Sequence, residues 1–163
     1  MINVCFVCHG NICRSPMAEF VFRDLCEKKG TLSKFNVTSR ATSNEEEGNP
    51  VHYGTKRILA RLGIDVSGKC AERISKDDIE KADYIIIMDE YNRGNLYRLA
   101  DRYGEKYKNA VIEKTRTLLS FTKRGGNIAD PWYTGDFEKT YEDVKEGCEC
   151  FYDFLSAAET NRN

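Results

Sequence analysis

The sequence predicts an α/β fold in which helices cover both faces of a parallel sheet. Apolar segments alternate along the chain with segments of helical character. Two of the apolar segments, residues 2–7 and 82–88, contain almost no polar residue. Such strands are typical of parallel sheets, because both faces of these sheets are buried under helices.

The elements are expected in a regular order along the chain. Strands are expected where β-branched and other apolar residues cluster, at residues 2–7, 35–42, 82–88 and 110–112. Helices are expected between and after them, from about residue 15, at 55–62, at 90–103 and from 137 to 155. A loop at about 115–135 precedes the last helix, and loops of that length are often functional.

The composition is that of one globular catalytic domain, expected to comprise residues 1–163. Hydrophobic residues make up 40% and charged residues 31%, and the net charge of −1 gives no reason to expect nucleic acid or an anionic membrane as a partner. The N-terminus has no basic segment, and the apolar stretches 4–8 and 84–88 are too short for a signal peptide or a membrane span. We therefore expect a cytoplasmic protein.

The cysteines and histidines suggest neither a disulfide framework nor a metal site. Seven cysteines are an odd number, and the chain has two histidines. We expect free thiols, no bound metal and no cofactor. Cys5, Cys26, Cys148 and Cys150 lie on apolar faces of their segments and are expected to be small core residues.

A candidate anion site follows the first strand, at the edge of the sheet where parallel α/β folds bind ligands. The segment is Cys8-His9-Gly10-Asn11-Ile12-Cys13-Arg14-Ser15-Pro16. A loop of this length, with Gly10 allowing close approach, can point successive N–H groups at one tetrahedral oxyanion. The helix that starts near Ser15 directs its positive end at the same point, and Arg14 adds a planar fork for two phosphate oxygens. Residues 8–15 are therefore expected to bind phosphate.

The same positive field favours a thiolate at Cys8, which makes this residue the expected nucleophile. Asn11 and Ser15 are expected to hold the loop, and the Ser15 hydroxyl can donate to the Cys8 sulfur. A purely structural alternative treats Cys8 as a small residue that ends a buried strand and Arg14 as a solvated residue at a helix start. The convergence of loop, helix and arginine favours the catalytic interpretation.

At residues 8–16 the sequence resembles the low-molecular-weight protein-tyrosine phosphatases, and the resemblance extends over about residues 2–155. It includes Ser39-Arg40, residues 50–52, residues 82–89 and Asp130-Pro131. The resemblance implies a four-stranded parallel sheet with helices on both faces, the phosphotyrosine protein phosphatase I-like fold. It also implies hydrolysis of a phosphotyrosine protein or a small aryl phosphate through a phosphocysteine intermediate, with phosphate as the product.

Asp130 is the expected general acid. A tyrosine leaving group departs as a phenolate whose conjugate acid has a pKa of about 10, so protonation of its oxygen assists departure near neutral pH. Asp-Pro by itself is an ordinary turn dipeptide, and it is the resemblance that favours a catalytic Asp130. Pro131 stiffens the turn, while Trp132 and Tyr133 are expected to flank the phenyl ring of the substrate. The family commonly carries two tyrosines at these last two positions.

Two departures from the family pattern concern the surroundings of the loop. Residues 45–47, three consecutive glutamates, replace the family's apolar rim. The family's His-x-Ala-Arg stretch, whose histidine helps to orient the loop serine, is not intact in residues 67–73. The sequence therefore does not predict which residue supports Ser15 and Asn11 through hydrogen bonds.

Three further residues have two interpretations each. Cys13 lies five positions from Cys8, so peroxide is expected to link the two thiols unless Cys13 merely packs beneath the loop. Asp89 is expected to cap the following helix, with contact to the loop as the alternative. His52 is expected to cap or orient a helix start rather than to catalyse.

Three other functions share this kind of loop. Arsenate reductases of similar fold use a Cys-x5-Arg loop but need two further cysteines to relay a disulfide, and no such pair stands between Cys70 and Cys148. Protein-arginine phosphatases typically carry threonine where Ile12 stands. A non-catalytic phosphate-sensing module would not need Cys8 and Asp130 together.

Overall fold

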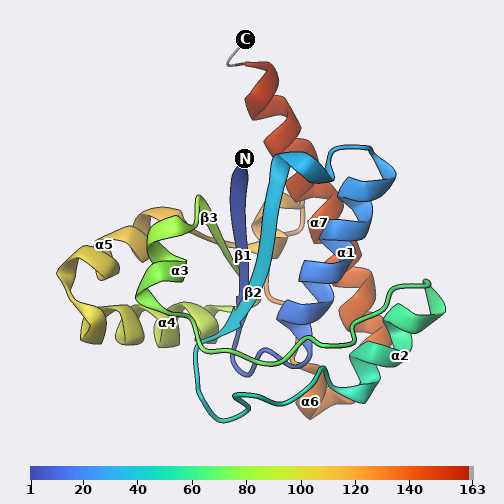
Figure 1. The fold of residues 1–163 in the computed structure, drawn as a ribbon, viewed down its shortest axis with the longest axis horizontal. Coiled ribbons are helices and arrows are strands. Elements are labelled where there is room, and N and C mark those ends of the chain that lie inside the picture. Colours follow the sequence, from blue (N-terminus) through green and yellow to red (C-terminus); the bar gives the residue numbers. More distant parts are fainter. Residues whose placement is uncertain (162–163) are drawn as a thin grey trace.

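A four-stranded, fully parallel sheet lies at the centre of the protein in a computed structural model that describes residues 1–161 (Figure 1). Its strand order is β2-β1-β3-β4. The strands are β1 (Ile2–Cys8), β2 (Phe35–Ala41), β3 (Tyr84–Ile87) and β4 (Thr115–Thr117). This arrangement confirms the predicted fold class. The last two residues of the expected domain, 162 and 163, lie outside the described residues.

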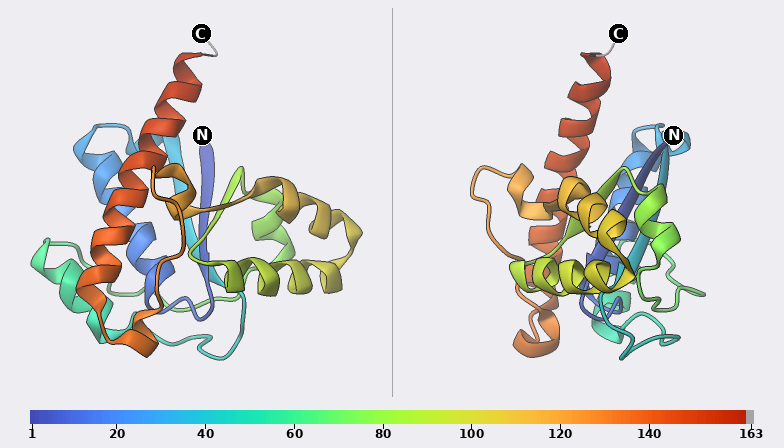
Figure 2. Two further views of the ribbon diagram at one scale, coloured as in Figure 1. Left: turned by 180° about the vertical axis from the view of Figure 1, so that it is seen from behind. Right: turned by 90° about the vertical axis from the view of Figure 1, so that its left-hand side faces the viewer.

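Helices cover both faces of the sheet. Helices α1 and α7 pack on one face with α2 beside them, and α3, α4 and α5 pack on the other (Figure 1 and Figure 2). No helix within residues 1–161 has both the length and the apolar character needed to cross a bilayer. The bounds of the α-helices and of two short 3₁₀ helices are α1 (Arg14–Lys28), η1 (Leu32–Lys34), α2 (Tyr53–Arg61), α3 (Lys76–Lys81), α4 (Glu90–Tyr103), α5 (Glu105–Lys114), η2 (Leu118–Phe121), α6 (Pro131–Thr134) and α7 (Phe137–Thr160).

The alternation of side chains along β1 explains its unbroken apolar sequence. Val4, Phe6 and Cys8 belong to the core under α1 and α7, whereas Cys5 and Val7 belong to the core under α4 and α5. All five side chains are at most 3% exposed, so both faces of the strand are buried. The strand ends with Cys8 at the carboxyl edge of the sheet.

The predicted strand at residues 110–112 is wrong, because these residues belong to α5. Val111 is fully buried against the core of that face, while Ile112 is 49% exposed. A three-residue apolar run fits one side of a helix as well as a strand, so the sequence pattern does not separate the two. The fourth strand is instead β4, where Thr115 and Thr117 are buried.

Two further differences concern short elements. The segment at residues 115–135, expected to be a loop, contains β4, η2 and α6. Helix α3 was not predicted, and it is defined by a capping box in which the Ser75 side chain accepts from the Asp78 N–H and the Asp78 side chain accepts from the Ser75 N–H. Helix α4, in contrast, has the predicted bounds.

One glycine is expected to be required for the packing of α7. A Cβ atom on Gly147 would lie 2.5 Å from Leu118 Cγ. We expect Gly147→Ala to lower the free energy of unfolding by about 1–3 kcal/mol, because overpacking outweighs the better helix propensity of alanine. Gly94→Ala in α4 is the matched control, since its Cβ would meet Arg98 at an ordinary 3.5 Å. Chemical denaturation measures both variants, and equal effects would contradict the packing argument.

Candidate active site

The loop that joins β1 to α1 lies where the strand order of the sheet reverses. β2 flanks β1 on one side and β3 flanks it on the other, so successive connections leave β1 in opposite directions. Ligands of parallel α/β folds bind outside the carboxyl ends of the strands at such a point. Residues 8–14 occupy this place, as the sequence predicts.

Neighbouring backbone holds this loop by its carbonyl oxygens. The oxygens of Cys8, His9 and Ile12 accept hydrogen bonds from N–H groups of residues 42–52, at 2.9 to 3.1 Å. Asn11 has a positive φ of 57°, which turns the chain tightly. Because its carbonyl groups are held from outside, the loop is suited to direct N–H groups toward its centre, as an anion site requires.

Cys8 lies at the start of the loop and is 3% exposed. Its sulfur accepts a hydrogen bond from the Asn11 backbone N–H at 3.3 Å and lies 3.0 Å from the Ser15 hydroxyl oxygen. The Ser15 oxygen also accepts from the Asn11 side chain at 2.8 Å. The Ser15 proton has two acceptors within reach, the Cys8 sulfur at 3.0 Å and the more distant Arg40 carbonyl oxygen at 3.4 Å. These groups and the N-terminus of α1 converge on the Cys8 sulfur, an arrangement that favours negative charge there.

Arg14 is 2% exposed and is held by three acceptors. Its Nη1 atom donates to Asp89 Oδ2 at 2.5 Å and to the Ile128 carbonyl oxygen at 2.9 Å, and its Nη2 atom donates to Asp130 Oδ2 at 3.3 Å. Both Nη1 hydrogens are thus used, which leaves the Nε hydrogen and one Nη2 hydrogen for a ligand. Burial by itself lowers the pKa of Arg14, but the negative charges of Cys8, Asp89 and Asp130 outweigh burial and raise that pKa.

Asp89 both caps α4 and contacts the loop, so both of its expected roles occur. Its Oδ1 atom accepts the Asn92 N–H at 2.8 Å and caps α4, as predicted, while its Oδ2 atom binds Arg14. Capping has a local sequence signal, whereas the ion pair joins residues 75 positions apart and has none. Asp89 is therefore a site residue in which the expected cap and the alternative contact with the loop occur together.

The loop, the Asp130 segment and the acidic run enclose a cavity of about 130 Å³. Asn11 and Ser15 are not among its walls, because they are buried behind the loop and support it. The structure thus brings together the other predicted site residues. The walls of this cavity, which we call the catalytic cavity, are Cys8, His9, Gly10, Ile12, Cys13, Arg14, Glu45, Glu46, Asp130, Trp132 and Tyr133.

The short helix α6 positions Asp130 at the cavity wall. Asp130 Oδ1 accepts the Trp132 N–H at 3.0 Å, and Pro131 occupies the first position of the helix. The Trp132 side chain is 58% exposed, and its ring meets the His52 ring edge-on at 5.7 Å. His52 caps α2 by accepting the Gly54 N–H, as predicted, so α2 supports this wall of the cavity.

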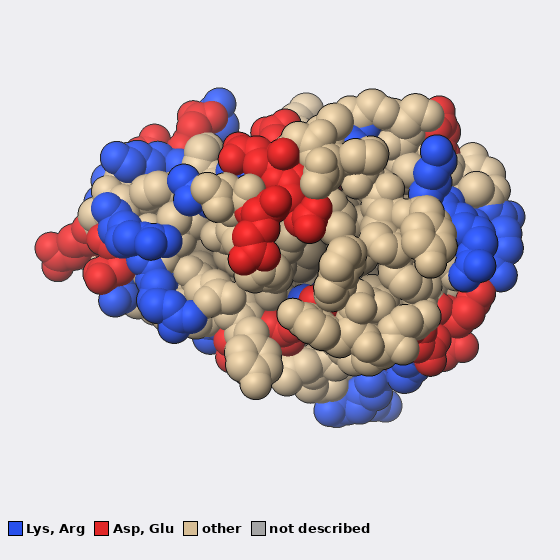
Figure 3. All heavy atoms as spheres, turned by 90° about the horizontal axis from the view of Figure 1, so that it is seen from below, with Lys and Arg blue, Asp and Glu red and all other residues tan. Residues whose placement is uncertain are grey.

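Two of the three residues in the acidic run border the cavity. Glu45 and Glu46 are wall residues, whereas Glu47 is not. Glu45 Oε2 lies 3.1 Å from Nε2 of His9, another wall residue. Figure 3 views the face at which the strands end, and acidic side chains gather near the middle of it. The run is therefore in part a rim of the site.

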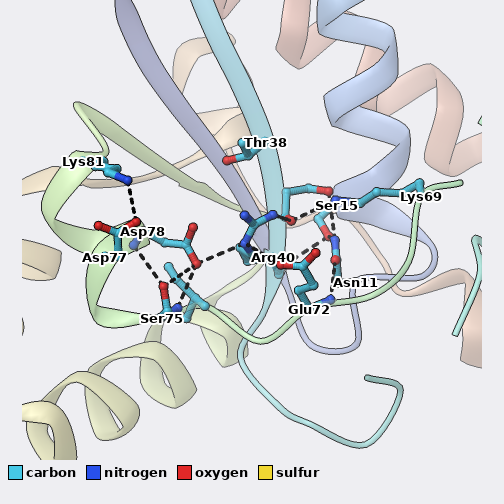
Figure 4. Close-up of polar contacts among 12 residues, drawn as sticks. Asn11, Ser15, Thr38, Arg40, Lys69, Glu72, Ser75, Asp77, Asp78 and Lys81 are labelled. Carbon is cyan, nitrogen blue, oxygen red and sulfur yellow. Dashed lines mark hydrogen bonds and ion pairs between the residues drawn. The ribbon is translucent and has the colours of Figure 1, made fainter. Parts of the chain in front are cut away.

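A buried network supports the loop without the histidine of the family pattern (Figure 4). Asn11 Nδ2 donates to the hydroxyl oxygens of Ser15 and Ser39 at 2.8 and 2.9 Å, and Asn11 Oδ1 accepts the Glu72 N–H at 3.1 Å. The Ser39 hydroxyl in turn donates to Glu19 at 2.5 Å. All the polar atoms of the Asn11 side chain are thus engaged in holding its position.

Lys69 and Glu19 form an ion pair behind this network. Their charged atoms are 3.1 Å apart, and their side chains are 13% and 7% exposed. Lys69 also donates to the Ser39 carbonyl oxygen at 3.1 Å. A signal for Glu19 existed in the sequence, because it lies on the same side of α1 as Ser15 and Phe22, at spacings of four and three residues. A lone charge on a buried helix face needs a partner. Lys69 supplies a buried partner, and the half-exposed Arg23 lies 3.7 Å from the other oxygen of Glu19.

Cys13 shares the catalytic cavity with Cys8, and its thiol holds its proton strongly. Burial raises the pKa of the Cys13 thiol to about 12, and the negative charges of Cys8 and Asp130 add to the increase. Cys13 is therefore a neutral thiol at physiological pH. A disulfide between Cys13 and Cys8 under peroxide stays a prediction.

The remaining cysteines lie outside the cavity. Burial raises the pKa of Cys5 to about 12 and that of Cys26 to about 11, and it raises the pKa of Cys148 as well. These three are core residues as predicted, whereas Cys150 is only partly buried and Cys70 is exposed. Within residues 1–161 no three His, Cys, Asp or Glu side chains are grouped as a metal ion would require.

The fold and the site together define an α/β protein with the cysteine–arginine phosphate loop of cysteine-dependent phosphatases. The family described as "Low molecular weight phosphotyrosine protein phosphatase" matches residues 3–161. The chain belongs to this family.

Individual proteins agree with this assignment. The chain is 43% identical over 151 residues to the low molecular weight protein-tyrosine-phosphatase YfkJ of Bacillus subtilis, an alignment that covers 91% of this chain and 92% of the relative. The crystal structure of YfkJ is similar with a TM-score of 0.85 at 40% identity, over 100% of this chain and 98% of that one. SP-PTP, a low molecular weight protein tyrosine phosphatase from Streptococcus pyogenes, has a TM-score of 0.77 at 42% identity, over 96% and 93% of the two chains. DARP, a Drosophila arginine phosphatase, has a TM-score of 0.81 at 29% identity, over 93% and 96%.

The Lys69–Glu19 pair makes a testable contribution to stability. Lys69→Met should lower the free energy of unfolding by about 1–3 kcal/mol, because it removes the buried cation at Glu19 Oε2. The remaining cation at Glu19 is Arg23, which is half-exposed and lies 3.7 Å from Oε1. Lys34→Met is the matched control, since its pair with Glu159 is exposed and such pairs contribute about 0–1 kcal/mol. Urea denaturation of both variants measures the difference. Similar decreases in the free energy of unfolding in the two variants would show that the buried pair stabilises the fold no more than the exposed pair.

Proposed function

We propose that the chain hydrolyses phosphotyrosine through a phosphocysteine intermediate, with Cys8 as nucleophile, Arg14 as phosphate ligand and Asp130 as general acid. The observation that supports this most directly is that Cys8, Arg14 and Asp130 line one cavity. Membership of the phosphotyrosine phosphatase family supports the same reaction.

The first step forms a bond from the Cys8 sulfur to phosphorus and breaks the bond from phosphorus to the phenolic oxygen. The electron pair of the broken bond goes to that oxygen, which takes a proton from Asp130. The loop N–H groups and Arg14 stabilise the negative charge on the three other phosphate oxygens. In the second step the Asp130 carboxylate takes a proton from water, the water oxygen attacks phosphorus, and phosphate and the Cys8 thiolate are released.

The walls of the cavity support an aryl phosphate as substrate. Trp132 and Tyr133 present exposed aromatic rings beside Asp130, where they can contact the phenyl ring of a phosphotyrosine residue. We propose a phosphotyrosine protein or a small aryl phosphate as substrate and phosphate as product. The acidic rim and the net charge of −1 do not favour nucleic acid. We further propose that the chain acts in the cytoplasm as one catalytic domain without a cofactor.

Hydrolysis of phosphoarginine is a second candidate. The similarity to a Drosophila arginine phosphatase favours it, and the Glu45 and Glu46 carboxylates would suit a guanidinium group. A parallel assay of phosphotyrosine, phosphoserine and phosphoarginine peptides and of arsenate separates the candidates. We expect the highest kcat/KM for phosphotyrosine, and faster turnover of phosphoarginine or reduction of arsenate would overturn this choice.

Three substitutions test the assigned roles. Cys8→Ser and Arg14→Ala should each abolish nearly all turnover, because one removes the nucleophile and the other removes the phosphate ligand. Asp130→Ala should slow esters with poor leaving groups by about 10²- to 10⁴-fold but spare activated esters, since only poor leaving groups need a proton. Single-turnover rates with a series of aryl phosphates measure this dependence. Equal slowing across the series would exclude Asp130 as the general acid.

The acidic rim should influence the choice of peptide. Glu45 and Glu46 should favour phosphotyrosine peptides with lysine neighbours over those with glutamate neighbours, through exposed charges worth about 0.2–1 kcal/mol per pair. The preference should weaken as salt screens these charges. The measurement is the Lys-to-Glu ratio of kcat/KM at low and high salt, in the Glu45→Gln/Glu46→Gln double variant and in Glu47→Gln as control. A ratio that is the same in the wild type and the double variant would show that the rim does not select peptides.

A further inference from the structure

A second cavity, of about 430 Å³, lies beside the catalytic cavity. The two share His9, Arg14, Asp130 and Tyr133 as wall residues, so a substrate larger than the first cavity has room in the second. The N-terminal turns of α4 and the segment that precedes Asp130 form the rest of it. The wall residues that belong to this cavity alone are Asp89, Tyr91, Asn92, Asn95, Asn127, Ile128 and Ala129, and we call it the amide cavity.

Three asparagines in this cavity have their oxygen atoms occupied by the protein. Asn92 Oδ1 accepts the N–H groups of residues 88 and 89 at 3.0 and 3.2 Å. Asn127 Oδ1 accepts the Glu90 N–H at 3.1 Å, and Asn95 Oδ1 accepts from Arg98 at 2.5 Å. Because these donors determine which way each amide points, it is the NH₂ groups that remain for other partners.

The Asn92 side-chain NH₂ group, the most deeply buried of the three, lacks a hydrogen-bond partner among the described residues. Asn92 is 1% exposed, and its Nδ2 atom is buried without a hydrogen-bond partner among the described residues. Buried donors of this kind are rare in proteins, because leaving one unpaired costs about 1–3 kcal/mol. Asn92 Nδ2 has no surface open to the cavity, so the amide donors that a ligand can reach are the NH₂ groups of Asn95 and Asn127. These donors favour a ligand that supplies hydrogen-bond acceptors.

The charges around the cavity decide what kind of acceptor fits. Its one cationic wall residue among the described residues, Arg14, already faces the carboxylates of Asp89 and Asp130. No surplus positive charge is left for an anion, so neutral acceptors such as carbonyl oxygens fit better than carboxylates. Tyr91 and Tyr133, 84% and 85% exposed, add aromatic surface for an uncharged side chain.

We propose that the amide cavity is a subsite for the polypeptide on one side of the phosphotyrosine, and that it binds backbone carbonyl oxygens and an uncharged, preferably apolar or aromatic, side chain. This inference rests on the proposed function, because it places the phosphotyrosine in the catalytic cavity. Glu45 and Glu46 border the catalytic cavity but not the amide cavity. A bound peptide therefore meets a negative rim on one side and uncharged donors on the other.

The test compares a peptide substrate with a substrate too small to reach the subsite. Tyr91→Ala and Asn95→Leu should each raise KM for a phosphotyrosine peptide with uncharged flanks by about 3- to 10-fold, the effect of losing one neutral hydrogen bond or a comparable contact. Their kcat for that peptide, and both constants for p-nitrophenyl phosphate, should stay at wild-type values. Asn109 is an exposed asparagine on α5, and Asn109→Ala is the matched control. It should leave kcat and KM unchanged for both substrates.

A peptide series then locates and defines the subsite. Replacing single flanking residues by alanine, phenylalanine or glutamate should reveal one side of the phosphotyrosine at which phenylalanine lowers KM and glutamate raises it, and this preference should disappear in Tyr91→Ala. If both variants turn over the peptide like the wild type, or if glutamate binds best at that side, the inference is overturned while the proposed function stands. If the wild-type protein releases no phosphate from p-nitrophenyl phosphate, the proposed function itself fails.

Discussion

The buried charge of Arg14 is the constraint on which the rest of the site depends. A guanidinium group removed from water needs acceptors around it, since a buried charge without partners is strongly destabilising. Its acceptors come from distant parts of the chain: Asp89 after β3, and Ile128 and Asp130 before α6. One side chain therefore joins the end of β1, the start of α4 and the acid-bearing segment. The same contacts leave the Nε hydrogen and one Nη2 hydrogen of Arg14 for a ligand.

The second requirement is a loop that keeps its shape when the cavity is empty. Backbone N–H groups bind an oxyanion well only if they are already oriented, because orienting them on binding would consume the interaction energy. Asn11 meets this requirement with a left-handed backbone conformation and a side chain fixed by Ser15 and Ser39. The Glu19–Lys69 pair fixes Ser39 in turn, so a charge pair replaces the histidine of the family pattern.

The surroundings of the catalytic cavity are chemically unequal. Glu45 and Glu46 make one side of the entrance negative, whereas the amide cavity on the other side offers uncharged donors and exposed aromatic rings. Arg14 and Asp130 stand between the two sides and belong to both cavities. The groups that bind phosphate and donate a proton are therefore also the boundary between two regions that differ in charge.

The sequence by itself determined the features that depend on local chemistry. Neighbouring residues are enough to predict the apolar run of β1, the loop from Cys8 to Arg14 and the caps at His52 and Asp89. This is because backbone periodicity and turn geometry act over a few positions. Asp130 came from the family resemblance, since Asp-Pro alone is an ordinary turn.

Only the tertiary structure decided the position of β4, the contact of Asp89 with Arg14, the Glu19–Lys69 pair and the meeting of three asparagines in one cavity. The contacts of Arg14 span 75 and 116 positions. Such contacts depend on which strand ends lie side by side, and the parallel order β2-β1-β3-β4 sets this, not any pattern within a segment.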